Sequence, residues 1–523
     1  MIKIFKIGAK QMKKDFKLRS LKSKHQHIKK FHQGLPIILG VCLISLTGIL
    51  KQFNFKELIN NMMELISDKF GILYLVSMNL FIVFSFILAL SKLGTIKLGS
   101  EDTKPEYTFG TWFAMLFGAG MGIGLVFWGV AEPIFHFTSP LGNTNEGSIE
   151  AANFAFVTSF MHWGIHPWAS YSIVGLAIAY FQFRKGKPSL VSSIFIPLIG
   201  EERASGLTGK MIDYFAVFAT VAGVSASLGM GTMQINSGLN YMFHIPENIK
   251  VQLIIIILIT FMFILSAVSG INKGISIISN INLILAFGIM VGCFFIGPTK
   301  DIMENFSKGT LSYLKSFLGS SIQLQGLKDR SWLGNWTIFY WAWWISWTPF
   351  VGMFIARISK GRTIREFVLG VILAPTLASI LWFSIFGTLG INLGINKIIT
   401  MEALKTIAAS PEIAFFKIIS YYPFHNVISI ITMILLCTFF ITSADSATFV
   451  LAMLTSKGSL NPSNKKKICW GIIEALLAII LLISGGLSAL QAMAIIAALP
   501  FVIIIIIGFI SLCKELRKDK LDL

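Results

Sequence analysis

The chain has 523 residues, of which 54% are hydrophobic and only 13% are charged. This composition is typical of proteins that cross a membrane several times, and it leaves no water-soluble domain of useful size. The net charge of +19 does not predict nucleic-acid binding, because the basic residues cluster at the ends of apolar segments and in the first 31 residues. The five cysteines have no paired spacing, so neither a disulfide framework nor a zinc site is predicted.

Apolar runs near the length of a membrane span predict an all-α protein with twelve transmembrane helices. They lie at 35–50, 72–90, 109–130, 152–183, 212–241, 251–269, 275–296, 333–358, 367–391, 427–454, 468–483 and 490–512. We therefore expect one transmembrane domain, 34–513, between a basic amino-terminal tail, 1–33, and a short carboxy-terminal tail, 514–523.

Basic residues in the loops predict the orientation of the chain in the membrane. Both tails and the loops predicted to be cytoplasmic are rich in Lys and Arg, whereas the loop at 133–151 has neither and is placed outside. The segment at 299–330 holds several lysines, but it is also placed outside, as an amphipathic surface helix around Leu311 to Leu318. The expected location is the cell membrane, with many passes and both termini in the cytoplasm.

The third and tenth spans contain residues that predict interrupted helices. The third has glycines at alternate positions from Gly118 to Gly124, and unwound backbone at membrane depth persists only where it lines a cavity. Close helix packing through small residues is the alternative. Glu132, just before Pro133, is expected to end this helix. In the tenth span, Asp445 predicts either a functional site or a structural hydrogen bond near a break.

Two groups of aromatic residues predict a site for a cation. Six of the twelve tryptophans fall between Trp332 and Trp347, and Trp336, Trp343, Trp344 and Trp347 share one helical face. The face of an indole ring attracts positive charge best where water is excluded, whereas an interfacial belt would explain only the first tryptophans of the run. In the fourth span, Trp163, Trp168 and Tyr171 form a second aromatic face.

A metal site in the fourth span is not favoured. His162 and His166 have the i, i+4 spacing of a metal pair. The sequence shows no third ligand and no Glu between them, which argues against a membrane metalloenzyme.

Five motifs resemble the betaine/carnitine/choline transporter family. They are Gly-Ala-Gly-Met-Gly-Ile-Gly at 118–124, Ala-Glu-Pro at 131–133, Trp-Ala-Trp-Trp-Ile-Ser-Trp-Thr-Pro-Phe at 341–350, Ala-Arg-Ile-Ser-Lys-Gly-Arg-Thr-Ile-Arg-Glu-Phe at 356–367 and Ile-Thr-Ser-Ala-Asp-Ser at 441–446. The resemblance, closest to sodium-coupled glycine betaine transporters, implies a LeuT-like core of two inverted five-helix repeats, about 109–297 and 333–512, after two extra helices. Such transporters work by alternating access and are commonly homotrimers.

The resemblance also implies the residues of the sites. The substrate would be held by Trp163, Trp168, Tyr171, Trp343, Trp344 and Trp347, near the backbone of Gly120, Gly122 and Gly124. One sodium ion would be held by backbone carbonyls of Gly118, Met121 and Phe439 and by the hydroxyls of Thr442 and Ser443. A second sodium site would include Phe350, Ser225 and Ser227.

Two positions bear on the energy source. Sodium-independent exchangers of the family place a positive residue where this chain has Asn282, and proton-coupled choline carriers tend to place Asp where it has Gly124. Both residues favour sodium symport of a zwitterion. The expected partners are a small quaternary-ammonium substrate, membrane lipid and further copies of the chain, without nucleic acid.

The sequence predicts no enzyme activity and no cofactor other than sodium as the coupling ion. The alternatives are a sodium-independent or proton-coupled carnitine or choline transporter of the same family, and a receptor or osmosensor that binds betaine without moving it. The short carboxy-terminal tail leaves osmotic activation open, because osmotically regulated members carry longer charged tails.

Overall fold

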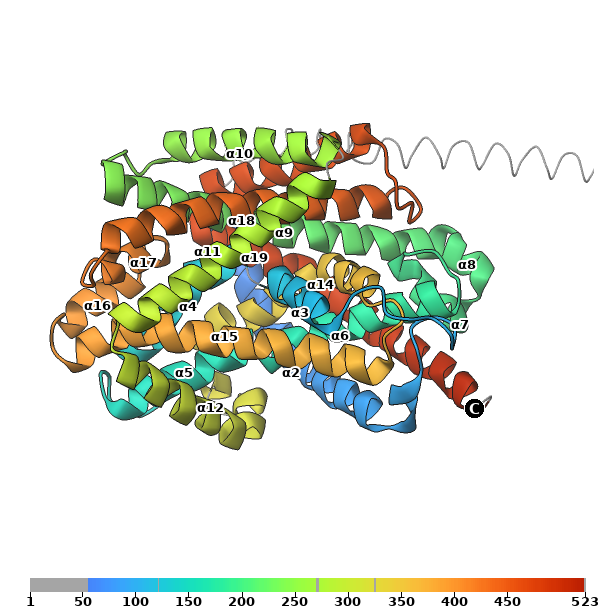
Figure 1. Ribbon diagram of the computed structural model, residues 1–523, viewed down its shortest axis with the longest axis horizontal. Helices are drawn as coiled ribbons and strands as arrows, with labels where there is room; N and C mark the ends of the chain where they lie inside the picture. Colours follow the sequence, from blue (N-terminus) through green and yellow to red (C-terminus); the bar gives the residue numbers. More distant parts are fainter. Residues whose placement is uncertain (1–54, 121, 270–271, 324–325, 522–523) are drawn as a thin grey trace, which may run out of the picture.

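The computed structural model describes residues 55–120, 122–269, 272–323 and 326–521, and within these ranges the protein is helical apart from loops and one isolated β-bridge between Lys97 and Thr363. Figure 1 shows long helices lying side by side, with shorter helices at both ends of the assembly. The predicted amino-terminal tail, the first predicted span at 35–50 and Met121 lie outside the described residues.

Seven of the described helices are long and apolar enough to cross a membrane. They are α2 (Phe55–Leu90), α9 (Leu207–Phe243), α10 (Ile249–Ser269), α11 (Asn272–Ile296), α15 (Ile364–Ile395), α18 (His425–Leu454) and α19 (Asn464–Leu521). The last two predicted spans are joined in α19, which kinks at Gly486 with φ +56° and ψ −134°. Only glycine adopts such left-handed backbone readily, so this residue permits the change of direction.

Three other predicted spans are built from shorter pieces. The third consists of α3 (Phe109–Gly120) and α4 (Ile123–Thr138), which confirms the predicted break among the glycines. The fourth consists of α5 (Ile149–Trp163) and α6 (Ile165–Ala179), and the eighth of α13 (Arg330–Leu333), η5 (Gly334–Ile338) and α14 (Phe339–Ile358). A side chain at Gly164, between α5 and α6, would lie 2.4 Å from the carbonyl oxygen of Phe160. The α5–α6 junction therefore needs a glycine.

One expected helix end and one expected helix break are wrong. Helix α4 continues past Glu132 and contains Pro133. Proline has no N–H and so removes one hydrogen bond of the helix, but nearly all residues of α4 are buried against neighbouring helices, which hold it in place. Helix α18 runs without interruption through Asp445. The hydroxyl of Thr442 donates to the carbonyl oxygens of Thr438 and Phe439, at 3.0 and 3.2 Å, so this polar segment is satisfied inside a regular helix.

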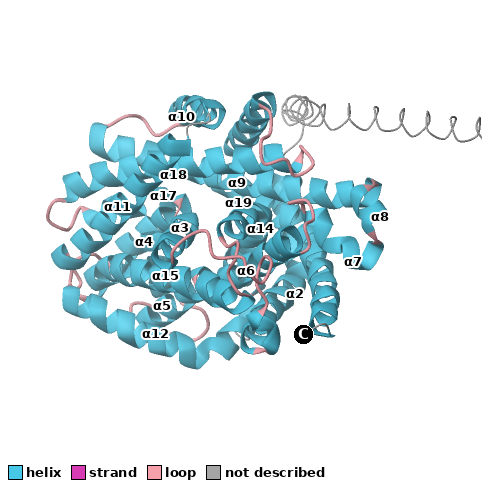
Figure 2. Ribbon diagram, turned by 45° about the vertical axis from the view of Figure 1, so that its right-hand side comes forward, coloured by secondary structure: helices cyan, strands magenta, loops and turns pink. Residues whose placement is uncertain are grey.

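Helix α14 lies within the bundle, where it packs against α6, α9 and α19 (Figure 2). Helix α12 (Thr299–Ile322) packs against α5 and α15 and exposes Leu311, Leu314 and Leu318, which confirms the helix predicted there. The remaining elements are η1 (Lys92–Thr95), η2 (Tyr180–Arg184), η3 (Val191–Phe195), α7 (Ile196–Ile199), α8 (Glu201–Ser205), η4 (Gly326–Lys328), α16 (Met401–Ala408) and α17 (Pro411–Ile419).

Candidate functional site

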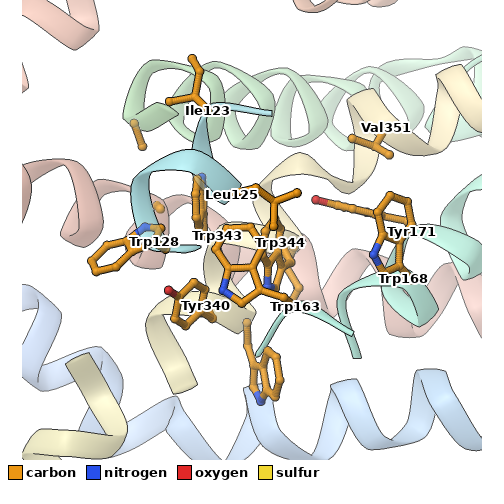
Figure 3. Packing of buried hydrophobic residues seen from close by; sticks show 14 of the residues in the cluster. Ile123, Leu125, Trp128, Trp163, Trp168, Tyr171, Tyr340, Trp343, Trp344 and Val351 are labelled. Atoms are coloured by element: carbon orange, nitrogen blue, oxygen red, sulfur yellow. The ribbon is translucent and has the colours of Figure 1, made fainter. Parts of the chain in front are cut away.

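All six aromatic residues predicted to hold a substrate line one cavity, which we call the aromatic cavity. They are Trp163, Trp168, Tyr171, Trp343, Trp344 and Trp347. Figure 3 shows Trp163, Trp343 and Trp344 grouped near Leu125 of α4, with Trp168 and Tyr171 to the right. None of the described lining residues carries an ammonium, guanidinium or carboxylate group, so the walls present mainly rings and aliphatic groups.

The rings of α5 and α6 meet those of α14 edge to face. Trp343 and Trp344 are stacked, with centroids 5.0 Å apart and planes 18° from parallel. Trp163 meets Trp344 at 4.9 Å and 78°, and Tyr171 meets it at 6.2 Å and 87°. A cation between these helices would contact several ring faces in a place that excludes water, which is where cation–π attraction is strongest.

The break between α3 and α4 lies at the same cavity. Gly122 and Gly124 line it, whereas Gly120 ends α3 and is not among the lining residues. The first N–H groups of a helix lack helical partners, and at α4 no side chain of the cap residue Gly122 accepts from them. The positive end of this helix dipole therefore lies beside the rings, and a carboxylate is the group that such an end attracts.

A carboxylate that the sequence did not assign to the site lies directly behind the rings. Glu132 is fully buried, and its Oε2 accepts hydrogen bonds from the indole N–H of Trp163 at 2.8 Å and from the hydroxyl of Tyr340 at 2.5 Å. Its Oε1 lies 2.7 Å from Nδ1 of His162, whose Nε2 lies 2.9 Å from the Thr337 hydroxyl. Glu132 thereby fixes the orientation of one ring of the cavity.

Sequence reasoning missed Glu132 because Pro133 suggested a helix end. The available signal was an ionisable residue inside an apolar span, which by default indicates function. Trp344 is fixed in a related way, because its indole N–H donates to the backbone carbonyl of His162 at 2.9 Å.

The same residues form the one described group whose spacing would suit a metal ion. Donor atoms of Glu132, His136 and His162 lie within 4.8 Å of one another. However, Glu132 and His162 are 2.7 Å apart, which is a hydrogen-bond distance, and two tetrahedral ligands about 2 Å from a metal would lie farther apart than this. We therefore interpret the group as a hydrogen-bond network. His166 is not part of it and stacks on Trp341 at 4.8 Å and 14°.

Comparison with known proteins decides the family. The family model described as betaine/carnitine/choline family transporter matches residues 35–521. The glycine betaine transporter OpuD of Bacillus subtilis (strain 168) is 49% identical over 482 residues, which cover 91% of this chain and 93% of that protein. The chain belongs to the betaine/carnitine/choline transporter family. It is therefore a membrane protein with several passes, from a family of transporters and not of enzymes.

Two further relatives align with nearly the whole length of this chain. A probable glycine betaine transporter of Desulfitobacterium hafniense (strain Y51) is 44% identical, over 94% of this chain and 98% of that protein. An ectoine/hydroxyectoine transporter of Virgibacillus pantothenticus is 42% identical, over 94% of this chain and 96% of that protein.

Of the residues predicted to hold the first sodium ion, Phe439, Thr442 and Ser443 lie on α18 and Gly118 lies on α3, whereas Met121 lies outside the described residues. The side-chain amide of Asn282 donates to the Thr442 hydroxyl at 3.1 Å, and that hydroxyl is 3.2 Å from the Phe439 carbonyl. Leu283, the next residue along α11, is the nearest side chain to Gly118. Ser443, one residue further along α18, lines the aromatic cavity. Of the α18 residues predicted for the ion, Ser443 thus borders the aromatic cavity and Thr442 is its neighbour in the chain.

The three residues of the second predicted sodium site do not line one cavity. Ser227 lines the aromatic cavity, whereas Phe350 lines a different one. The hydroxyl of Ser225 donates to the backbone carbonyl of Glu474 at 2.9 Å. The second sodium site therefore stays a prediction for this transporter.

Substitution of Gly124 by alanine tests how closely the rings approach the start of α4. The added methyl group would lie 2.7 Å from Trp343 and 2.9 Å from Trp163, so at least one of these indoles must move. We expect the substrate concentration for half-maximal uptake to rise at least about tenfold, equivalent to ~1.4 kcal/mol. Radiolabelled uptake in cells would measure it. Gly288→Ala, which meets nothing within 4 Å, is the matched control, and equal kinetics of the two variants would contradict the prediction.

Proposed function

We propose that this protein is a secondary transporter that couples inward sodium movement to the uptake of glycine betaine or a closely related quaternary-ammonium solute. The aromatic cavity carries this proposal. A trimethylammonium group spreads its charge over methyl groups and donates no strong hydrogen bond, so stacked rings suit it better than a carboxylate does. The relatives named as glycine betaine transporters support the same substrate.

Glycine betaine carries one positive and one negative group, and the aromatic cavity offers a different surface to each. We infer that its ammonium group lies between the rings of α6 and α14, while its carboxylate faces the uncapped start of α4 near Gly122 and Gly124. A free cation such as choline would gain nothing from this helix end. No charged side chain among the described lining residues competes for either end of the substrate.

The wider architecture is part of the same proposal. The chain would form twelve membrane-spanning helices, with the two helices before 109 outside a LeuT-like core of inverted repeats at about 109–297 and 333–512. The breaks between α3 and α4 and between α5 and α6 support this arrangement, since transporters of that kind hold substrate beside broken helices. We further propose a homotrimer in the cell membrane, in contact with lipid and with both termini in the cytoplasm.

Uptake of radiolabelled glycine betaine into proteoliposomes tests the function. An inward sodium gradient is compared with an equal inward potassium gradient, and uptake is expected only with sodium. Equal uptake in both would remove sodium coupling and favour a sodium-independent or proton-coupled carrier of the same family. Binding without accumulation would favour a receptor.

Removing hydroxyl groups from α18 tests the ion site through the sodium dependence of uptake. We expect the double substitution Thr442→Ala and Ser443→Ala to raise the sodium concentration for half-maximal uptake about tenfold or more, because two of five neutral oxygen ligands are lost. Sodium titration of the initial uptake rate measures this. Thr438→Ala, one turn earlier with its hydroxyl bonded to Ile434, is the matched control. An unchanged sodium requirement in the double variant would refute the assignment.

A further inference from the structure

A second cavity, of about 210 Å³, follows the aromatic cavity along the same two helices. On α14, Trp347 lines the first cavity and Phe350 lines the second. Their ring centroids are 5.6 Å apart and their ring planes meet at 62°. On α18, Ser443 lines the first cavity and Asp445 the second. The two spaces are therefore consecutive, with the Trp347–Phe350 pair between them.

Unlike the aromatic cavity, the second cavity is lined by charged groups of both signs, and we call it the charged cavity. Asp445 from α18, Arg357 from the end of α14 and Lys467 from the start of α19 all face it. Asp445 is only 3% exposed and Lys467 only 9% exposed. Among the described residues, none of the three forms an ion pair within 4.0 Å. Asp445 lies inside a predicted span, where an ionisable residue is costly and marks a pathway for substrates or ions.

The described contacts of these groups are hydrogen bonds and a ring contact, and Asp445 and Lys467 contact adjacent residues of α10. Asp445 accepts only a hydroxyl hydrogen bond, from Ser266 at 2.6 Å, among the contacts described. Lys467 donates to the backbone carbonyl of Ala267 at 2.8 Å. The cationic groups of Arg357 and Lys467 lie 5.8 and 5.6 Å from the centre of the Phe449 ring, so the positive side of the cavity is concentrated around one aromatic residue.

We infer that the charged cavity is a second binding site for the transported quaternary-ammonium carboxylate, occupied between the aromatic cavity and the cytoplasm. The carboxylate of the ligand would face Arg357 and Lys467, and its ammonium group would face Asp445 and the Phe350 ring. A molecule with one charge of each sign complements these walls, whereas a simple cation or a simple anion leaves one side uncompensated. This site rests on the proposed function, because it takes the same substrate.

The position of the cavity supports a role on the exit side. Its rim includes Gln182 and Ser189, close to the loop with Lys185 and Lys187, and Leu460 from the loop before α19. Both loops belong to the face that the charge rule assigns to the cytoplasm. A substrate that leaves the rings past Trp347 and Phe350 would enter this space next.

Equilibrium binding of radiolabelled glycine betaine to the purified full-length protein tests the inference. The wild type is expected to bind two molecules per chain, one tighter and one weaker. Asp445→Asn and Arg357→Gln should each lose the weaker one and keep the tighter one, which also shows that these variants fold. Trp344→Ala should lose the tighter one and keep the weaker one. Unlabelled choline, which lacks the carboxylate, should not displace the weaker ligand.

The possible results separate this inference from the proposed function. Lys465→Gln, an exposed lysine close to Lys467 in sequence, is the control and should retain both ligands. One betaine per wild-type chain, or a weaker ligand that persists in both Asp445→Asn and Arg357→Gln, would overturn the second site while the transport function stands. A wild-type chain that binds no betaine would overturn both.

Discussion

Replacing Trp344 with alanine is expected to raise the glycine betaine concentration for half-maximal uptake by about 30-fold or more. Trp344 contacts Trp163, Trp343 and Tyr171 and thus joins the two walls of the aromatic cavity. A desolvated cation–π contact contributes about 2 kcal/mol, and each 1.4 kcal/mol is a factor of ten in affinity. Kinetics of radiolabelled uptake at saturating sodium measure the change.

Two further variants separate the lost ring from a general loss of packing. Trp344→Phe keeps a π face but loses the hydrogen bond to the His162 carbonyl, so we expect an intermediate increase. Trp470→Phe alters a buried tryptophan that is bonded to Thr455 and is not among the described residues lining the aromatic cavity, and its substrate affinity should not change. Wild-type affinity in Trp344→Ala, with the variant inserted in the membrane, would disprove the role of the aromatic cavity.

The aromatic cavity could be predicted from sequence because its signal is local. Trp343, Trp344 and Trp347 fall on one face of a single helix, so their sequence spacing alone predicts that they line one space. The glycines before Ile123 predicted the break for a similarly local reason, since backbone without side chains does not sustain a helix there. Helical spacing did not exclude Trp336, which the structure places against Phe135 and His136.

The errors and omissions come from interactions between distant parts of the chain or from hydrogen bonds that sequence does not show. Pro133 did not end α4, because its neighbours in space hold the helix together. The polar run around Thr442 did not break α18, and the Thr442 hydroxyl bonds to carbonyl oxygens of the helix itself. The charged cavity depends on Lys467 and Asp445 facing one space, and no local pattern brings those two residues together.

The buried carboxylate of Glu132 gives the other large expected effect. Substitution by leucine would leave the N–H of Trp163, the hydroxyl of Tyr340 and a ring nitrogen of His162 without their partner. Each buried polar group that loses its partner costs about 1–3 kcal/mol. We therefore expect Glu132→Leu to lower the thermal unfolding temperature by several degrees and to abolish measurable uptake.

Glu132→Gln distinguishes positioning of the ring from charge. The amide oxygen of glutamine can still accept hydrogen bonds from Trp163 and Tyr340. Its NH₂ group can donate to Nδ1 of His162 if the proton of that ring is on Nε2, which faces the Thr337 hydroxyl. If Glu132 acts by holding Trp163, the glutamine variant keeps its betaine affinity within about threefold and unfolds near the wild-type temperature. The measurements are uptake kinetics and thermal unfolding of the purified protein.

A matched control shows whether the effect is specific to the network behind the rings. Asp213 is another buried carboxylate held by hydrogen bonds, from the N–H and hydroxyl of Ser192 at 2.9 and 2.8 Å, and it is not among the described residues lining the aromatic cavity. Asp213→Asn should leave betaine affinity unchanged. If Glu132→Gln also lost all measurable uptake, the cavity would require the negative charge of Glu132 and not only the orientation of Trp163.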